Sequence, residues 1–342
     1  INVFIMFMIL FYRVSSNNIN CYNDYDNKVD WWIILKIPYT KDISTGYEYI
    51  YYDNNTMDKT FTVHNGFLND TNNPLFFTLK QLNDNYDNKN VGYYLYNDEP
   101  FLTSNHVTTN YDYTYGHTKG VVQFDINGGY FLTHSVPRFP QPPNSHYFYP
   151  ENEIEYGQSM MCLSINIDQI DIIGKQLRYT KPNIFSYNLP DIYDLPETKL
   201  IINKIWYVYP MISISSFITT NKQNITSIVK TWNTGLDLYE DIVAVKLIDD
   251  MYVESWQREG KLPNYVKPCY KYDITNIINI QINDIYKYTS TKDHSKYSIT
   301  ENNNIVCISD MNRDTGQRVR GGGCVCFTHI NLHNAFHNII SF

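Results

Sequence analysis

The sequence predicts an α/β fold of the α+β kind, made of two similar halves whose mixed sheets carry flanking helices and are related by a pseudo-two-fold axis. Three observations predict it. A histidine and a lysine two residues apart occur twice, as His117 with Lys119 and as His294 with Lys296. Each pair is followed by two apolar runs around a turn-forming cluster, which is the pattern of a β-hairpin. The 342 residues are enough for two domains or one large one.

The two predicted hairpins follow the same plan. After His117, the apolar runs 121–124 and 130–134 flank an Asn-Gly-Gly turn, and the second run ends at His134. After His294, the runs 297–299 and 305–308 flank an Asn-rich turn, and Asn312 follows shortly. Each return strand therefore brings another polar side chain back beside its His-Lys pair. This self-similarity indicates a diverged internal duplication.

The first half is predicted over residues 17–190 from alternation, turn residues and prolines. Trp31 and Trp32 are expected to pack in its core or at a sheet edge rather than to form a platform for stacked bases. The Pro-rich stretch 135–150 cannot run as a central strand and is expected to be an exposed excursion past the site. The predicted elements in chain order are strands at 29–38 and 47–53, a helix at 75–82, a strand at 91–96, a polar loop at 103–115 and a strand at 160–167.

The second half is predicted over residues 191–342, with the two halves forming one catalytic unit. The proline-containing stretch 180–197 is expected to connect them, and a strand is predicted at 251–258. Because no His or Cys cluster accompanies them, three acidic residues are predicted to lie on a solvated face rather than in a metal site: Asp237, Glu240 and Asp241. The run Gly321 to Gly323 allows two interpretations, a backbone approach to a phosphate or a tight turn.

The His-x-Lys spacing has a chemical meaning if each segment is a strand. Side chains at i and i+2 point to the same face, so both groups of a pair would meet one ligand. A neutral imidazole can attack phosphorus, and a protonated one can donate to a leaving oxygen. A lysine can hold the non-bridging oxygens as a point charge. Two facing pairs would make a metal-free phosphodiesterase site. A chain of this composition contains roughly half a His-x-Lys match by chance, so the prediction depends on the sequence around each pair.

Beyond these pairs, the chain resembles the deoxyribonuclease II family within the phospholipase D superfamily, in which two such half-sites share one active site. The similarity extends from about residue 20 to 330. The segments that carry it are Gly116-His117-Thr118-Lys119-Gly120-Val121, His134-Ser135-Val136-Pro137-Arg138-Phe139-Pro140, Asp293-His294-Ser295-Lys296, Asp310-Met311-Asn312-Arg313, Arg320-Gly321-Gly322-Gly323, Val29-Asp30-Trp31-Trp32 with Lys36 and Pro38, Tyr96-Asn97-Asp98, Tyr156-Gly157-Gln158 and Leu238-Tyr239-Glu240-Asp241.

The resemblance implies a metal-independent acid endodeoxyribonuclease that needs no cofactor and leaves 3′-phosphate and 5′-hydroxyl ends through a phosphohistidine. We expect His117 to be the nucleophile and His294 the acid, although the pseudo-symmetry allows the reverse order. Lys119 and Lys296 would stabilise the equatorial oxygens, and the supporting donors to the phosphate would be His134 and Asn312. Where relatives often carry acids before the Arg-Gly-Gly-Gly segment, this chain has Gln317, which could reduce activity.

Two alternatives stay open at this stage. The same chemistry could serve a phospholipid or another phosphodiester. A protein of a different class, a catalytically silent secreted DNA-binding or host-interaction protein, could use the same scaffold.

Arg138 could contact a DNA phosphate or simply fix its loop. The oligomeric state, monomer or homodimer, is not predicted.

Charge and histidine content bear on the working pH. The formal net charge is −8 with histidines neutral, so the composition does not indicate a strongly basic nucleic-acid-binding surface. Protonating all nine histidines gives −8 + 9 = +1, which removes the acidic balance. An enzyme that acts on DNA in an acidic vesicle would gain from this change, but any histidine-containing chain shifts in this direction.

The six cysteines form an even set without C-x-x-C metal spacing, which beside a secretory start indicates disulfides. Six cysteines allow 15 pairings, so the sequence alone gives no connectivity. The family resemblance implies Cys21 with Cys162, and Cys307 with Cys326. Cys269 and Cys324 then remain as a pair by elimination.

The first twelve residues are apolar and too short for a membrane span, so residues 1–16 are predicted to be a partial signal peptide, with a buried strand as the alternative. Sequons at Asn54, Asn69 and Asn224 fit a glycoprotein. We therefore expect a protein of the secretory pathway, lysosomal/endosomal or secreted, without a stable membrane anchor.

Overall fold

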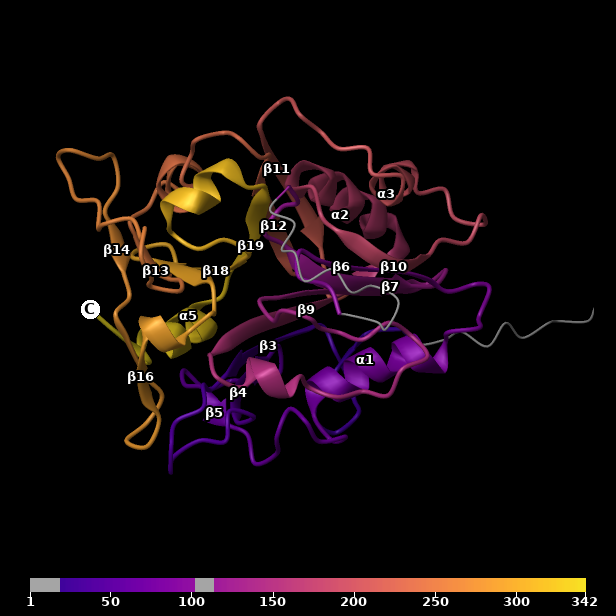
Figure 1. Ribbon diagram of the computed structural model, residues 1–342, viewed down its shortest axis with the longest axis horizontal. Coiled ribbons are helices and arrows are strands. Elements are labelled where there is room, and N and C mark those ends of the chain that lie inside the picture. The colour runs from indigo at the N-terminus through magenta and orange to yellow at the C-terminus, as the bar shows by residue number, and fades with distance from the viewer. Residues whose placement is uncertain (1–18, 102–113) are drawn as a thin grey trace, which may run out of the picture.

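The computed structural model describes residues 19–101 and 114–342. The predicted signal peptide and most of the predicted loop at 103–115 lie outside the described residues. The rest folds into two large sheets with helices on their faces (Figure 1), so the predicted mixed α/β class is confirmed.

The first sheet has eight strands in the order β10-β6-β7-β8-β9-β3-β4-β5, all paired antiparallel. Every strand predicted in the first half is present, and the connection at 180–197 adds β10, which pairs with β6 at the edge. The bounds are β3 Trp31–Lys36, β4 Tyr49–Asp53, β5 Thr62–Val63, β6 Gly92–Asn97, β7 Lys119–Phe124, β8 Gly128–His134, β9 Gln158–Asn166 and β10 Ile184–Asn188.

The second sheet has seven strands in the order β11-β12-β19-β18-β17-β13-β14, and only the β13–β14 pair is parallel. The bounds are β11 Ile212–Ile218, β12 Asn224–Lys230, β13 Met251–Glu254, β14 Ile274–Asn276, β17 Tyr297–Thr300, β18 Ile305–Ser309 and β19 Gly322–Thr328. Two small sheets join β1 Cys21–Tyr22 to β2 Lys28–Val29, and β16 Lys287–Thr289 to β15 Asn279–Gln281 and β20 Ile340–Ser341.

The two large sheets repeat one strand order. In the first, β6-β7-β8-β9-β3 are neighbours, and in the second β13-β17-β18-β19-β12 are neighbours with the same antiparallel directions. Both predicted His-Lys hairpins are present, as β7–β8 and β17–β18, and each occupies the same place in this order. The pseudo-two-fold axis remains a prediction.

The largest apolar core lies between the sheets. It joins side chains such as Trp31 and Phe131 of the first sheet to Ile299 and Phe327 of the second, together with α2 Ile167–Thr180 and α5 Ile330–His337. Burial of these large side chains is the main force that holds the halves together. Trp31 and Trp32 are both buried, as predicted.

Helices cover the outer faces of both sheets. The helix α1 Pro74–Asp84 packs on the first sheet, on the face opposite α2 (Figure 1), through Leu75, Leu79 and Leu82. It begins where the Asn73 side chain accepts a hydrogen bond from the Phe76 amide at 2.8 Å. The π-helix η2 Leu238–Ala244 covers the second sheet. Shorter helices are α3 Pro196–Ile202, α4 Val245–Leu247, η1 Glu151–Glu153, η3 Ser290–Lys292 and η4 Thr315–Val319.

Two segments that were predicted to be exposed to solvent are at least partly buried. The stretch 135–150 forms no strand, as its prolines require, but much of it is buried, with Val136 and Phe139 inside the core below the first sheet. Its apolar side chains fill the space between α1 and the site. Of the three acidic residues predicted on a solvated face, Asp237 is buried, with its carboxylate 3.2 Å from Nε of the buried Arg313. Asp241 is exposed as predicted, and Glu240 is half-buried.

The two disulfides that the resemblance implied are present, Cys21–Cys162 and Cys307–Cys326. The remaining pairing was wrong: Cys324 is a buried thiol on β19, whereas Cys269 is exposed, and both are free. Pairing by elimination failed because burial separates the two. None of the helices in the described residues is long and apolar enough to cross a bilayer.

Candidate active site

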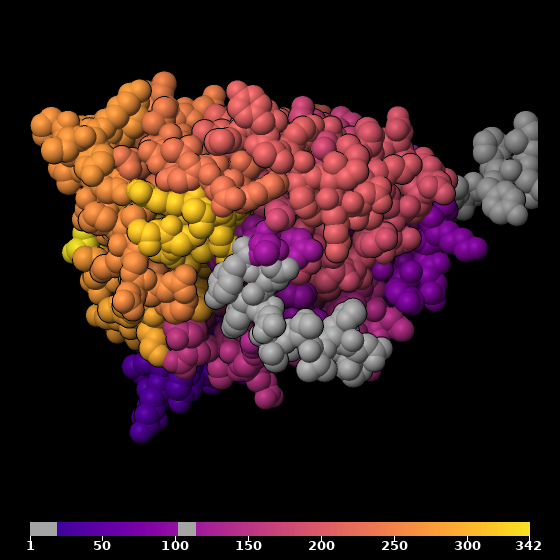
Figure 2. All heavy atoms as spheres, turned by 45° about the horizontal axis from the view of Figure 1, so that its top comes forward, coloured from indigo at the N-terminus to yellow at the C-terminus, as the bar shows by residue number. Residues whose placement is uncertain are grey.

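Both His-Lys pairs line a single cavity of about 480 Å³. His117 and Lys119 enter it from the start of β7, and His294 and Lys296 enter it from the segment before β17. Asn312, just beyond β18, also lines it. In the space-filling view, magenta segments of the first half adjoin orange and yellow segments of the second half (Figure 2), so residues distant in the chain share one surface. The convergence that the sequence predicted is present.

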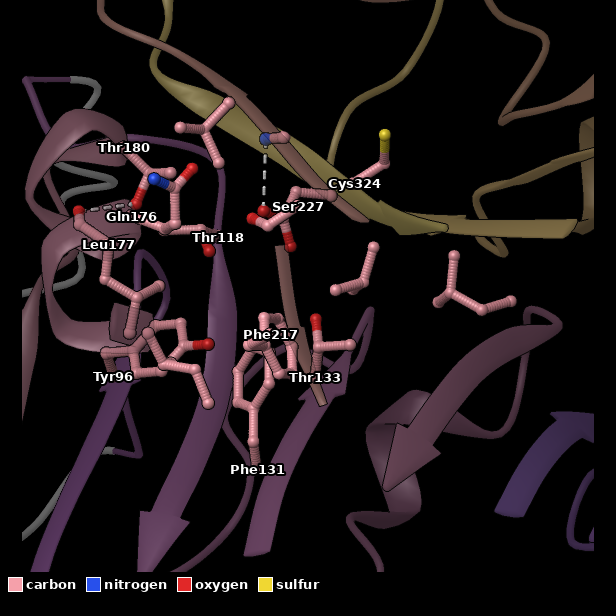
Figure 3. A pocket seen from close by; sticks show the side chains of 16 residues that line it. Tyr96, Thr118, Phe131, Thr133, Gln176, Leu177, Thr180, Phe217, Ser227 and Cys324 are labelled. Atoms are coloured by element: carbon pink, nitrogen blue, oxygen red, sulfur yellow. Dashed lines mark hydrogen bonds between the residues drawn. The ribbon is translucent and has the colours of Figure 1, made fainter. Parts of the chain in front are cut away.

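The alternation expected of the first pair is also present. Thr118, between His117 and Lys119, does not line the large cavity. It lines a second, small cavity of about 30 Å³ between the halves, whose wall includes Phe131, Phe217 and Cys324 (Figure 3). The histidine and the lysine therefore share one face, and the threonine takes the other.

The second half holds His117 in place. The His117 amide donates to the Gly321 carbonyl at 2.8 Å, and its ring Nδ1 lies 2.5 Å from the Asp310 carbonyl. Because a carbonyl only accepts, Nδ1 must carry the proton, and Nε2 then keeps its lone pair. Gly116 permits this approach, since a Cβ there would lie 1.7 Å from the Thr180 carbonyl oxygen.

The first half holds His294 in the same way. The His294 amide donates to the Gly157 carbonyl at 2.8 Å. The imidazole stacks on Tyr156 with ring centroids 4.0 Å apart and lies 4.1 Å from the Trp256 ring. Its Nε2 is buried and has no hydrogen-bond partner among the described residues. The backbone amide of each histidine is thus bound by the opposite half, while Trp256 of the same half also contacts the His294 ring.

The two lysines have different partners. Lys119 forms a buried ion pair with Asp98, which also pairs with Arg320 at 2.8 Å. Lys296 donates to the His294 carbonyl at 2.5 Å, and no carboxylate of the described chain lies within ion-pair distance of it. Burial, reinforced by the charge of Lys119, lowers the pKa of Lys296 to about 7. One lysine is therefore neutralised locally and the other is not.

Both imidazoles of the cavity favour the neutral form. Burial and the neighbouring Lys119 lower the pKa of His117 well below its usual value. Burial and Lys296 lower the pKa of His294 to about 2. Asp98 opposes this effect at His117, but burial and the lysines outweigh it.

His134 does not join the other five predicted residues at the cavity wall. It is buried beside Phe139, where its Nδ1 accepts from the Val136 amide at 3.2 Å. Burial, with Lys119 as the next cause, lowers its pKa to about 3. Its Nε2 has no partner among the described atoms.

Sequence reasoning missed several residues of the cavity wall as site residues. Tyr156 and Trp256 contact the His294 ring, and Asp98 pairs with both Lys119 and Arg320. Tyr156, Asp98 and Arg320 stand in segments that carry the family resemblance, which was the available signal, but Trp256 carried none. The remaining missed residues of the wall are Glu99, Ser135, Pro137, Asn152, Glu153, Arg258 and Gly316.

The structure shows the surroundings of three sites whose roles the sequence left undecided. Arg138 lines the cavity with its guanidinium 3.7 Å from the Glu153 carboxylate, and its amide donates to the Glu99 carbonyl, so it is tied into its loop. Gln317 is buried in the cavity wall. The glycines of 321–323 do not form a tight turn: Gly322 and Gly323 belong to β19, where a Cβ on Gly323 would lie 2.4 Å from the Ile228 carbonyl oxygen.

The chain is thus an α+β protein whose two large sheets share a cavity lined by two imidazoles and two lysine ammonium groups. The family model of deoxyribonuclease II matches residues 20–342. The chain therefore belongs to the deoxyribonuclease II family and is a hydrolase of that type.

Individual relatives agree with this assignment. The chain is 32% identical to deoxyribonuclease-2 of Caenorhabditis elegans, over 97% of this chain and 95% of the relative. It is 30% identical to plancitoxin-1 of Acanthaster planci, with 96% and 92% covered, and 31% identical to deoxyribonuclease-2-alpha of Mus musculus, with 96% and 93% covered.

Proposed function

We propose that this chain is an acid endodeoxyribonuclease that hydrolyses DNA without a metal ion and leaves 3′-phosphate and 5′-hydroxyl ends. The observation that carries the proposal is the convergence of His117, Lys119, His294 and Lys296 on one cavity. DNA is the substrate that the names of the relatives indicate. The cavity is large enough for a nucleotide phosphate and part of its sugar.

His117 acts as the nucleophile. Its Nδ1 proton is held by the Asp310 carbonyl, so the Nε2 lone pair is available at the pH where the ring is neutral. Nε2 attacks the phosphorus, a nitrogen–phosphorus bond forms, and the bond from phosphorus to the 5′ oxygen breaks. The DNA product departs with a 5′-hydroxyl, while the other strand end stays on His117 as a phosphohistidine.

His294 protonates the departing 5′ oxygen and then takes a proton from the water that attacks the phosphohistidine. Burial and Lys296 lower the pKa of the His294 ring to about 2, which favours its neutral form. A bound phosphodiester places a negative charge beside both lysines and the ring, which raises the pKa of the imidazole. Acid catalysis by His294 therefore depends on the substrate. Because His117 must be neutral while His294 is protonated, the pH profile should be bell-shaped.

Lys119 and Lys296 stabilise the equatorial oxygens of the transition state. Both ammonium groups are buried, so they act in a medium of low dielectric where charge stabilisation is strong. Asn312 lines the same cavity and offers its amide N–H groups to the phosphate. His134, which lies behind the wall, would support this arrangement through packing.

The donor set of the cavity favours a metal-free reaction. Each histidine has a lysine two residues on that lines the same cavity, and an ammonium group repels a divalent cation. The cationic residues of the wall also outnumber the acidic ones, five to three: Lys119, Arg138, Arg258, Lys296 and Arg320 against Asp98, Glu99 and Glu153. This excess favours a phosphate ligand even though the whole chain is acidic.

A secretory location fits the same proposal. The disulfides Cys21–Cys162 and Cys307–Cys326 are compatible with an oxidising compartment. We propose a lysosomal, endosomal or secreted enzyme on this basis, since an acidic vesicle would supply the protons that the reaction needs.

Supercoiled plasmid at pH about 5 with excess EDTA tests the function, because this pH lies below the unperturbed pKa of imidazole. We expect nicked and linear products whose 3′ ends need phosphatase treatment before a polymerase extends them. His146→Ala is the control for the His117→Ala and His294→Ala variants, since His146 is exposed and lies outside the cavity. Loss of cleavage with EDTA would contradict the metal-free reaction. A folded protein that binds DNA without cutting it would identify a silent binder.

A further inference from the structure

Two buried lysines outside the catalytic pairs occupy equivalent places in the two sheets. Lys36 is the last residue of β3, and Lys230 is the last residue of β12. These strands correspond in the repeated order, since β3 neighbours β9 as β12 neighbours β19. Both side chains are fully buried, with 0% of their surface exposed. A buried ammonium is costly unless its donors are satisfied, so each must have a defined partner set.

Backbone carbonyls surround each ammonium group. Lys36 Nζ donates to the carbonyls of Ile37, Gly46 and Ile154 at 3.1, 2.9 and 3.0 Å. Lys230 Nζ donates to the carbonyls of Gln317, Arg318 and Arg320 at 3.2, 3.1 and 2.5 Å. An ammonium has three N–H donors, so three converging carbonyls match it in number. The Thr234 hydroxyl is a fourth, more distant acceptor at 3.4 Å from Lys230 Nζ.

Each lysine binds the loop that positions a catalytic histidine of the other half. Lys36 does so through one of its three carbonyl partners, that of Ile154, whereas all three carbonyl partners of Lys230 belong to such a loop. Ile154 lies three residues before Gly157, and this loop carries the stacking Tyr156 and the carbonyl that accepts from the His294 amide. Arg320 directly precedes Gly321, whose carbonyl accepts from the His117 amide. A lysine of one half thus acts on the histidine of the opposite half through one loop.

We propose that Lys36 and Lys230 are matched positioning residues, which fix His294 and His117 respectively by holding the loops 154–157 and 317–321. This inference rests on the proposed function for its effect on DNA cleavage, but the positioning itself is independent of that function. Neither lysine lines the cavity, so neither contacts the reacting atoms.

The charges around the two lysines agree with this role. Burial lowers the pKa of Lys36 to about 7, against the raising effect of Asp293, Glu48, Glu153 and Glu155. Burial lowers the pKa of Lys230 to about 8, against the raising effect of Asp237. Both are therefore ammonium groups with three donors at acidic pH, where the enzyme is proposed to work.

Methionine keeps the length of lysine and removes its donors, so Lys36→Met and Lys230→Met test the proposal. The direct measurement is the imidazole ¹⁵N spectrum of the labelled protein at pH about 5, assigned with the His117→Ala and His294→Ala variants. We expect Lys36→Met to shift the His294 resonances and leave those of His117. We expect Lys230→Met to do the reverse. Lys175→Met, at an exposed position on α2, is the control and should shift neither.

Plasmid cleavage supplies a second measurement on the same variants. A displacement of about 1 Å costs on the order of 100-fold in rate, so we expect kcat to fall about 10- to 100-fold with KM changed less than about twofold. Equal shifts of both histidines in both variants, or no shift in either, would overturn the proposal. If the wild type does not cut DNA but the crossed shifts are observed, the positioning stands and the proposed function fails.

Folding of the variants could itself be affected, since each removes three buried hydrogen bonds. Lys36→Gln and Lys230→Gln retain two N–H donors and provide a milder test, with smaller shifts expected in the same crossed pattern. If neither variant of a lysine folds, that lysine is needed for the fold as a whole and the proposal is rejected for it.

Discussion

The two half-sites share a strand order and a His-x-Lys spacing, yet their surroundings differ. In the first half, the His117 ring is fixed by the Asp310 carbonyl, and Lys119 is paired with Asp98. In the second half, the His294 ring lies against Tyr156 and Trp256, and Lys296 has no carboxylate at ion-pair distance among the described residues. The comparison teaches that two half-sites with the same residue spacing can give their imidazoles different surroundings. Under the proposed mechanism, this difference would suit His117 to attack and His294 to donate a proton once an anion is bound.

Removal of the nucleophile should have the largest effect. We expect His117→Ala to lose at least about 10⁴-fold in kcat, because loss of a nucleophile also removes the covalent route. The loss should be equal for plasmid DNA and for a phosphodiester with a p-nitrophenolate leaving group, since both need the attack on phosphorus. Steady-state kinetics on the two substrates measure this. A smaller loss than in His294→Ala would reverse the assignment of the two histidines.

Removal of the acid should have a large effect that depends on the leaving group. We expect His294→Ala to lose about 10²- to 10⁴-fold in kcat on DNA, the usual contribution of a general acid. With p-nitrophenolate, which leaves without a proton, the first step should be nearly normal and produce a burst of nitrophenolate. Absence of any recovery with this substrate would contradict the role of His294 as the acid.

The buried ion pair of the first half should contribute to stability. Burial raises the pKa of Asp98, but Lys119, His117 and Arg320 outweigh it and hold the carboxyl pKa well below its usual range. Its contribution is therefore present above the unfolded pKa near 4 and is lost only as the pH falls through the lower folded value. We expect Asp98→Asn to lower the free energy of unfolding at pH 5 by about 3 kcal/mol. Urea unfolding with Asp241→Asn as the control measures it, and an unchanged free energy would contradict the pairing.

Buried His134 should make the protein less stable in acid. Its folded pKa of about 3 lies below the unfolded value near 6.5, so the unfolded state binds more protons between these values. Stability should thus be full above pH 6.5 and fall as the pH decreases toward 3, by about 2 kcal/mol at pH 5 from this residue. We expect His134→Leu to show a shallower decline between pH 7 and 5 in chemical unfolding. An unchanged slope would indicate that His134 is protonated in the folded state.

The smallest expected effect concerns the two free cysteines. A thiol reagent should modify one cysteine of the native protein, the exposed Cys269, and two after unfolding, when Cys324 becomes accessible. Cys269→Ser should change the free energy of unfolding by less than about 0.5 kcal/mol, as is usual at the surface. Peptide mass spectrometry that finds Cys269 joined to Cys324 would contradict the structure.

The sequence predicted what depends on short range and on periodicity. The shared face of His117 and Lys119 follows from strand alternation, and both hairpins follow from their turn residues. The burial of 135–150 was not predictable, because prolines show only that a segment is not a central strand. The carbonyl sets around Lys36 and Lys230 were equally hidden, since each joins segments more than 80 residues apart. Long-range partners such as Trp256 for His294 are fixed by packing rather than by local pattern.

The most direct test of the account is the structure of the enzyme with vanadate, which imitates the phosphorus at the moment of attack. We predict one vanadate in the cavity, bonded to His117 Nε2, with His294 Nε2 at hydrogen-bond distance from the oxygen on the opposite side and both lysines near the equatorial oxygens. Vanadate bound to one half alone, or two anions held separately by the two halves, would contradict the claim that both histidines act on a single phosphate.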